Sequence, residues 1–196
     1  MKIYDITRVL QEAPVYPGSE PIQFERLCSP ENGDEYRTSL ITAESHMGTH
    51  ADAASHFLID GAAIDQMPLD CYFGPCRVVT AADISSEHIE AKELSDVLAG
   101  CERLVLRTKG SRFLSRKAAA AIVCAGIRAV VTDALSVAPP DDEAAIHRIL
   151  LNAGIAIVEN AILDGVPDGS YILSAFPVKI GGCDGSPVRA VLIAEN

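Results

Sequence analysis

The chain is poor in basic residues, with 16 Lys and Arg against 27 Asp and Glu among its 196 residues. The net charge of −11 argues against a nucleic-acid partner, because phosphate recognition needs clustered Lys and Arg. Basic amphipathic segments are also missing, and the longest apolar run, residues 118–127, is too short to span a bilayer. We therefore expect no nucleic-acid partner and no membrane partner.

Two further absences bear on the cellular compartment. Residues 1–5 lack the apolar segment of a signal peptide, so we expect a cytoplasmic protein. The six cysteines include no Cys-x-x-Cys pair, and the spacing of Cys71 and Cys76 fits no common zinc-site pattern. In a protein that is not secreted, scattered cysteines are more often small buried hydrophobic residues than disulfides.

The length and the 48% hydrophobic content allow one sizeable core, and no linker, repeat or low-complexity tract divides the chain. Residues 1–196 are therefore expected to form a single domain. In the second half, helix and strand patterns alternate. The expected helices are 89–98, 115–125 with Ser115 as the cap, and one from Asp141 to Gly154; the expected strands are 103–108, 127–132 and 155–159.

The two ends of the chain show a different pattern. The first eighty residues alternate between apolar and polar positions and are broken by Pro, Gly and acidic turns, while residues 171–180 and 188–194 are typical of a strand pair. The sequence thus predicts an α/β domain, with a mixed β-sheet core, packed helices and strand-rich ends.

Three of the five histidines and one aspartate lie within eleven residues, beside a Gly-Thr turn signal. These residues are His46, His50, Asp52 and His56. Imidazole and carboxylate groups are ligands that divalent metals accept. A solvated polar loop is the alternative interpretation, but such a dense group favours a metal site.

The spacing requires a bend in the chain. An extended strand would separate His46 from His50 by about 13 Å at roughly 3.3 Å per residue, too far for one metal to bridge. A continuous helix would turn Asp52 to another face. We therefore expect a bend at Gly48, with His50 and Asp52 on one strand face. His56 is expected on a following turn, towards the open side of the metal.

Further ligands must come from elsewhere in the chain. His147 lies in the third expected helix, and Glu159 ends the strand that follows. The helix runs one way and the strand returns, so the two residues can lie side by side at a similar height along the strand. A buried carboxylate at that strand end needs a partner. The spacing alone is equally compatible with a surface histidine and an exposed glutamate. His88 follows a polar run typical of a helix start, so we expect it on the surface.

The His-x-x-x-His-x-Asp-x-x-x-His motif resembles the signature of the metal-dependent cyclase/hydrolase family, which includes the bacterial kynurenine formamidases. The resemblance extends over nearly the whole chain, through residues 16–18, 60–69, 106–108, 147–151, 154–160 and 185–190. It implies the swivelling β/β/α fold and a homo-oligomer, a homodimer or a homotetramer. The implied fold agrees with the mixed α/β pattern described above.

The resemblance also implies a role for each candidate residue. Two divalent metal ions are implied, with zinc as the first expectation and manganese as the alternative. One metal would be held by His46, His50 and Asp52, and the other by Asp52, His147 and Glu159. His56 would be the general acid and base, and Tyr16 would contact a small-molecule substrate.

Hydrolysis of an amide is the function that this resemblance implies. N-formyl-L-kynurenine would give L-kynurenine and formate when a metal-activated water attacks the formyl carbonyl. The chain has no Trp and carries Tyr16 where the formamidases usually have Trp, which favours an alternative in which a related enzyme acts on another cyclic amide, lactone or aryl amide. A metal-binding module without catalysis would be expected to lose some of the six positions, and all six are present.

Overall fold

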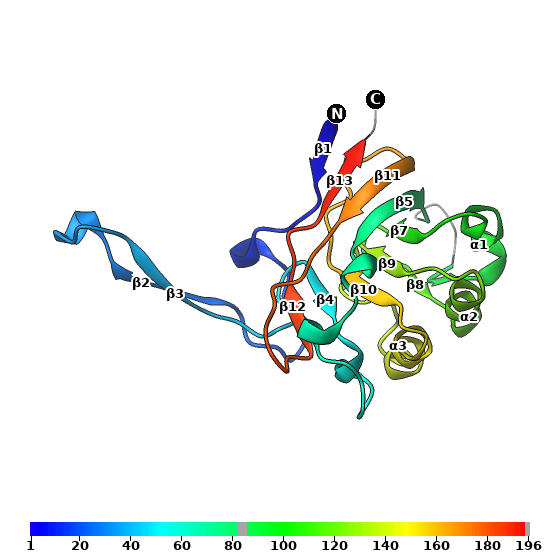
Figure 1. The fold of residues 1–196 in the computed structure, drawn as a ribbon, viewed down its shortest axis with the longest axis horizontal. Helices are drawn as coiled ribbons and strands as arrows, with labels where there is room; N and C mark the ends of the chain where they lie inside the picture. Colours follow the sequence, from blue (N-terminus) through cyan, green and yellow to red (C-terminus); the bar gives the residue numbers. More distant parts are fainter. Residues whose placement is uncertain (82–85, 195–196) are drawn as a thin grey trace.

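The computed structural model describes residues 1–81 and 86–194, and its centre is a nine-stranded mixed sheet (Figure 1). Across the sheet, the strands follow the order β1-β13-β11-β5-β7-β9-β10-β4-β12. The bounds are β1 Lys2–Asp5, β4 His50–Asp52, β5 Phe73–Thr80, β7 Arg103–Arg107, β9 Ala129–Thr132, β10 Ala156–Glu159, β11 Gly169–Ser174, β12 Gly185–Pro187 and β13 Val191–Ala194.

Smaller elements complete the fold. Two short sheets pair β2 Gln23–Cys28 with β3 Thr38–Thr42, and β6 His88–Ile89 with β8 Phe113–Leu114. The three α-helices are α1 Ala91–Leu98, α2 Arg116–Cys124 and α3 Glu143–Asn152, and they gather on one side of the sheet (Figure 1). The protein therefore has an α/β fold with a mixed sheet, as the sequence predicts.

The middle of the sheet is parallel and buried on both faces. β5, β7, β9 and β10 pair in parallel. β5 exposes Phe73 and Pro75, but the apolar residues of β7, β9 and β10 are buried and alternate between two apolar clusters. Leu104 and Leu106 pack in the cluster that contains the helices, whereas Val105 packs in the cluster on the opposite face. Burial on both faces explains why these strands are nearly continuous apolar runs.

The opposite face is closed by the two ends of the chain. Ile6 follows β1, Tyr72 precedes β5 and Leu192 lies in β13, and all three are fully buried there. β1, β13 and β11 form an antiparallel group at one edge, and β4 with β12 forms another at the far edge. The predicted strand-rich ends are thus confirmed.

Some predicted bounds differ from the structure. His88 does not start a helix: it lies in β6, because its backbone pairs with Phe113 of β8, and α1 begins only at Ala91. The strand expected over 171–180 ends at Ser174, and beyond it the chain keeps only an isolated bridge between Pro177 and Val188. Both differences arise from pairing with distant segments, which local patterns do not contain.

The cysteines are free thiols, but they do not share one environment. Cys71, Cys76 and Cys101 are buried, as expected for small apolar residues, and burial raises the pKa of the Cys76 thiol to about 12. Cys124 is exposed, so the expectation of burial is wrong for this residue. It lies in the last turn of α2, on the face away from the sheet cluster.

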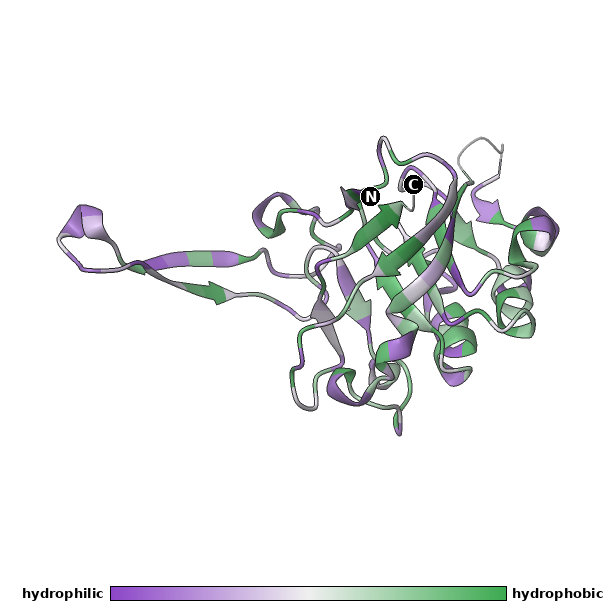
Figure 2. Ribbon diagram, turned by 45° about the horizontal axis from the view of Figure 1, so that its top comes forward, coloured by the Kyte–Doolittle hydropathy of each residue, from purple (hydrophilic) through white to green (hydrophobic). Residues whose placement is uncertain are grey.

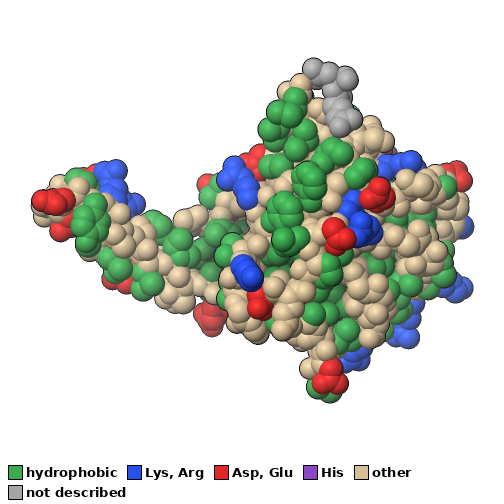
Figure 3. Space-filling view, viewed as in Figure 1, with side chains coloured by type: hydrophobic (Ala, Val, Ile, Leu, Met, Phe, Trp, Pro, Cys, Tyr) green, Lys and Arg blue, Asp and Glu red, His purple; other side chains and the backbone are tan. Residues whose placement is uncertain are grey.

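One long feature leaves the compact body. The hairpin of β2 and β3 projects from it as an arm, which we define as residues 23–42 (Figures 1 and 2). Hydrophobic side chains are visible along its surface (Figure 3). Across residues 1–81 and 86–194, no helix combines the length and apolar character that a membrane crossing would need.

The cap of α2 provides a test of the helical layer. The Ser115 side chain accepts a hydrogen bond from the Ala118 backbone N–H, which satisfies one of the free donors of the first turn. We expect Ser115→Ala to lower the free energy of unfolding by about 1 kcal/mol. Chemical denaturation measures this change. Ser115→Thr keeps a hydroxyl cap and should retain most of the stability; equal losses in both variants would contradict the capping role.

Candidate metal centre

β4 carries the middle of the histidine motif and lies between β10 and β12. In the antiparallel pairing of β4 with β10, His50 stands opposite Glu159. On the other side of β4, Gly185 of β12 stands opposite Asp52. Alternate residues of a strand share one face, so His50 and Asp52 point to the same side of the sheet. The register then brings Glu159 to them.

The chain bends before β4, as the sequence predicts. Gly48 has a φ of +65°, a conformation that favours glycine, and an added Cβ would lie 2.6 Å from Leu10 Cδ2. The bend places the rings of His46 and His50 5.0 Å apart and nearly perpendicular. His56 follows on a 3₁₀ turn, Ala54–His56, which confirms its predicted place after the strand.

The inner part of the site joins four buried side chains from β4, β10 and α3. His147 Nε2 lies 3.2 Å from Glu159 Oε1 and 3.4 Å from Asp52 Oδ2. His50 Nε2 lies 3.5 Å from Asp52 Oδ1 and 3.6 Å from Glu159 Oε2. The two carboxylates therefore share both imidazoles, and the predicted approach of His147 to Glu159 is present in the structure.

Backbone carbonyls orient both inner imidazoles. His50 Nδ1 lies 2.9 Å from the Gly48 carbonyl oxygen, and His147 Nδ1 lies 2.8 Å from that of Glu143. A carbonyl oxygen only accepts, so each Nδ1 carries the hydrogen. Each Nε2 then faces the carboxylates with its lone pair whenever the ring is neutral, which is the arrangement of a metal-binding histidine.

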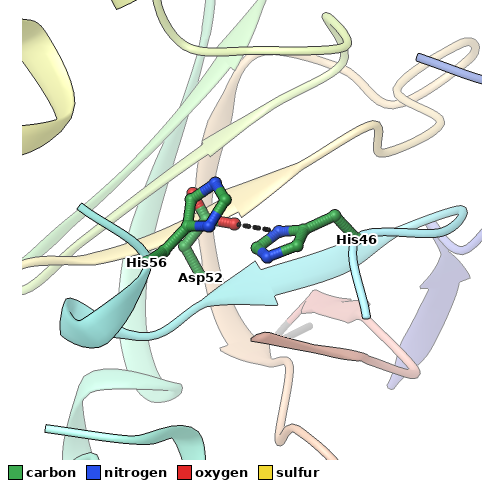
Figure 4. Close-up of side chains that lie close together, drawn as sticks. All are labelled: His46, Asp52 and His56. Atoms are coloured by element: carbon green, nitrogen blue, oxygen red, sulfur yellow. Dashed lines mark hydrogen bonds and ion pairs between the residues drawn. The ribbon is translucent and has the colours of Figure 1, made fainter. Parts of the chain in front are cut away.

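The outer part of the site joins His46, His56 and Asp184. His46 Nδ1 lies 3.0 Å from Asp52 Oδ1, the contact drawn in Figure 4, and His46 Nε2 lies 3.1 Å from Asp184 Oδ2. His56 Nδ1 lies 3.3 Å from the same Asp184 oxygen. The rings of His46 and His56 stack at 3.9 Å between centroids. An added Cβ on Gly185 would lie 2.6 Å from His46 Cε1, so this close packing needs glycine.

The buried carboxylates of the site are stabilised by positive charge close to them, as the pKa shifts of the neighbouring groups indicate. Burial opposes a charged imidazole at His147, but its contacts with Asp52 and Glu159 outweigh burial and raise its pKa to about 11. Burial also opposes ionisation of Asp52, yet His147 and His46 hold its pKa well below its usual range. At His56, burial dominates and lowers the pKa, which favours the neutral ring.

A divalent metal fits these residues. Asp52 Oδ2 is buried and has no hydrogen-bond partner among the described residues, although His147 Nε2 lies 3.4 Å away. Two groups of side chains bring ligand atoms within 4.8 Å of one another: His46, Asp52 and His56, and His50, Asp52 and Glu159. Asp52 belongs to both groups. A nitrogen and oxygen donor set of this kind suits zinc or manganese.

A cavity of about 530 Å³ opens over these residues, and its outer wall is partly aromatic. Tyr16, Phe57 and Leu135 line it, and the Phe57 ring stacks on the His147 ring at 4.4 Å. The Tyr16 hydroxyl donates to Glu143, 3.0 Å from each carboxylate oxygen. Burial and this carboxylate raise the pKa of Tyr16 to about 12.

The structure brings all seven predicted site residues together. Six of them line one pocket, and Asp52 lies buried against His46, His50 and His147. Three further lining residues that the sequence did not single out contact the predicted ones. Asp184, Glu143 and Phe57 come from the loop before β12, the first turn of α3 and the turn after His56. Phe57 follows the histidine motif directly, which was a usable signal. Asp184 and Glu143 look like ordinary loop and helix-start acids. The division of the ligands between two metals stays a prediction.

Comparison with known proteins identifies the family. A family model described as putative cyclase matches residues 4–139. The chain is 37% identical to a kynurenine formamidase of Bacillus cytotoxicus, in an alignment that covers 96% of this chain and 95% of the relative. It is 39% identical to a kynurenine formamidase of Bacillus mycoides, with the same coverage. The similarity therefore extends over nearly the whole of both chains.

Solved structures agree with this result. A structure described as a potential metal-dependent hydrolase with cyclase activity is 29% identical, with a TM-score of 0.84, and covers 100% of this chain and 99% of its own. Isatin hydrolase A from Labrenzia aggregata is 20% identical, with a TM-score of 0.84 over 99% of this chain and 94% of its own, and supports the fold alone. The chain belongs to the putative cyclase family.

Proposed function

We propose that this protein is a metal-dependent hydrolase that cleaves the carbon–nitrogen bond of N-formyl-L-kynurenine, giving L-kynurenine and formate. The observation that carries this proposal is a pocket with an aromatic wall, lined by Glu159 and by histidines that also contact the buried Asp52 beneath it. The full-length similarity to kynurenine formamidases supports a formamide as the substrate.

Two divalent metal ions complete the site in this proposal, with zinc as the first choice and manganese as the alternative. His46, His50 and Asp52 hold one metal, while Asp52, His147 and Glu159 hold the other. When bound, such ions lower the pKa of a water molecule and polarise a carbonyl group. The shared position of Asp52 between His46 and His147 supports a bridging role.

His56 is the proton carrier. Its Nδ1 donates to Asp184, which holds the ring in place and leaves Nε2 free to exchange a proton. Contacts with Ser45 and His46 outweigh burial and lower the pKa of Asp184, so this carboxylate stays ionised and accepts. Nε2 of His56 takes the proton released when water adds to the formyl carbon. It returns that proton to the amine nitrogen as the carbon–nitrogen bond breaks and formate leaves.

The aromatic wall orients the substrate. Tyr16 and Phe57 offer ring faces beside the histidines, and Leu135 adds an apolar contact. Aromatic rings stack favourably in offset or edge-to-face arrangements, so an aryl group is well accommodated. Tyr16 offers a smaller ring than the Trp usual in formamidases and still contacts the substrate through its face.

Turnover of formamides tests this function. We expect the zinc-loaded or manganese-loaded protein to hydrolyse N-formyl-L-kynurenine faster than lactones and cyclic imides of similar size. Chelation should abolish the rate and lower Tm, because Asp52 and Glu159 lose the cations that balance their buried charge. Metal analysis, product detection and thermal melts measure these effects. Failure of the metal-loaded protein to hydrolyse any aryl formamide contradicts the proposed function.

Replacement of His56 tests the proton carrier. We expect His56→Ala to lower kcat by about 100-fold to 10,000-fold, the usual range for loss of a general acid or base, with bound metal retained. His88→Ala is the matched control, because His88 lies in β6 outside the pocket. Steady-state kinetics and metal analysis check both variants. A His56→Ala protein with full metal and full rate would show that the assigned role is wrong.

We also infer that the protein forms a homodimer or a homotetramer and that the arm lies in a contact between subunits. Two-stranded hairpins are only marginally stable on their own in water. Phe24 stands opposite Ile41 on one face of the arm, Leu40 lies on the other, and each is about half exposed. A second copy that packs against the arm would cover both faces, and closed symmetry is the commonest form of assembly.

Charged substitutions on the arm test whether it lies in a contact between subunits. We expect the double variant Phe24→Glu, Ile41→Glu to lower the mass of the particle in light scattering, because like charges are placed on an apolar contact. Ile59→Glu changes a fully exposed isoleucine outside the arm and should leave the mass unchanged. A wild-type monomer, or an arm variant with the wild-type mass, contradicts the inference.

A further inference from the structure

Glu143 is a pocket residue that the proposed reaction does not use. It is the first residue of α3, and it lies one helical turn before His147 on the same helix face. Its side chain lines the cavity together with Tyr16 and Phe57. At roughly 1.5 Å per residue, Glu143 lies about 6 Å from His147 along the helix axis, towards the outer wall.

The Glu143 carboxylate keeps acceptor capacity for a ligand. An ionised carboxylate offers about four acceptor positions, and Tyr16 supplies a single hydroxyl donor. Among residues 1–81 and 86–194, no other side chain hydrogen bonds or pairs with this carboxylate. It is half-buried, so a charged donor from a ligand would meet less competition from water than at the open surface.

The outer wall of the cavity carries acidic side chains. No Lys or Arg occurs among the described residues that line the cavity, whereas Glu143 and Glu44 stand on the outer wall. Glu44 is the more exposed of the two, and it already accepts from the Glu20 backbone N–H at 2.9 Å. Glu143 is therefore the more sheltered of the two carboxylates, and it contacts the hydroxyl of the aromatic Tyr16.

We propose that Glu143 is a specificity-determining residue that binds an ammonium group carried on the side chain of an aryl substrate. The aryl ring lies against Tyr16 and Phe57, and the ammonium group donates to the free positions of the Glu143 carboxylate. The preferred substrates are then aryl formamides with an amino group near the ring, a class that includes N-formyl-L-kynurenine. The reaction part of this statement rests on the proposed function, whereas the binding contact does not.

The experiment must distinguish ammonium binding by Glu143 from an alternative in which Glu143 only positions Tyr16. Glu143 could serve only to hold the Tyr16 hydroxyl and so fix the ring. In that case its loss would weaken every aryl ligand equally. If Glu143 binds an ammonium group, its loss weakens cationic ligands and spares neutral ones. Tyr16→Phe removes the hydroxyl without removing the ring or the carboxylate.

The experiment uses two probes of matched size, 2-phenylethylammonium and 2-phenylethanol, titrated into the metal-loaded protein and followed by ligand-observed NMR. We expect the wild type to prefer the ammonium probe by about tenfold, in line with a hydrogen bond to a charged group. Glu143→Gln should lose this preference and change the affinity for the alcohol by less than about twofold. Glu87→Gln, an exposed acid outside the pocket, should retain the preference.

The outcomes distinguish ammonium binding by Glu143 from a role in positioning Tyr16. They also distinguish the proposed binding contact from the proposed hydrolysis. Tyr16→Phe should retain the preference for the ammonium probe. Equal binding of both probes by the wild type, no binding of either, or equal loss of both in Glu143→Gln overturns the proposal. Failure to hydrolyse formamides would instead contradict the proposed function, and the probe preference would still report on Glu143. With active protein, Glu143→Gln should lower kcat/KM more for N-formyl-L-kynurenine than for neutral formanilide.

Discussion

The arrangement of this protein depends on two buried carboxylates, which lie on the neighbouring strands β4 and β10. Asp52 and Glu159 are almost completely buried, and carboxylates in such a place are costly unless cations or donors balance them. His50 and His147 lie against both of them, and backbone carbonyls fix the ring nitrogens that point away. The antiparallel register of β4 and β10 is what brings these charges together, so the sheet and the site depend on each other.

The site divides into a rigid part and a part carried by turns. Asp52, His50 and Glu159 lie on strands of the central sheet, and His147 lies on a helix packed against it. Sites built on regular elements hold ligands in fixed geometry. His46, His56 and Asp184 come from turns and loops at the cavity, where side chains meet incoming molecules. The strands and the helix thus carry four of the five proposed metal ligands, while the turns and loops carry the fifth, His46, together with the proposed proton carrier His56 and its partner Asp184.

The pocket and the arm are structurally connected. Tyr16 and Ser19 precede the arm, Glu44 and Ser45 follow it, and all four line the cavity. A contact that orders the arm would therefore also order this part of the wall. In the proposed function, the aromatic and acidic groups of that wall distinguish substrates, whereas the buried carboxylates and histidines below it hold the metals. Variation in reaction on one fold is expected to arise in such outer walls.

Local sequence features were enough to predict much of this arrangement. The density of ligands in the histidine motif, the bend at Gly48, the cap at Ser115 and the apolar parallel strands all follow from short-range geometry. Glu159 could be suspected because an acid that ends a buried strand needs a partner. The pairing of that acid with His147 was one of two readings that the spacing allowed, and only the packing of α3 on β10 decided between them.

Only the tertiary structure decided which residues far away in the sequence contact the candidate site residues. Asp184 reaches His46 and His56 because β12 pairs with β4, and Glu143 reaches Tyr16 because α3 packs beside the loop before the arm. His88 entered a strand for the same kind of reason, through its pairing with β8. The sequence by itself determined the candidate metal ligands, since ligand type and spacing are local properties. Their final partners depended on strand register and helix packing, which join segments more than a hundred residues apart.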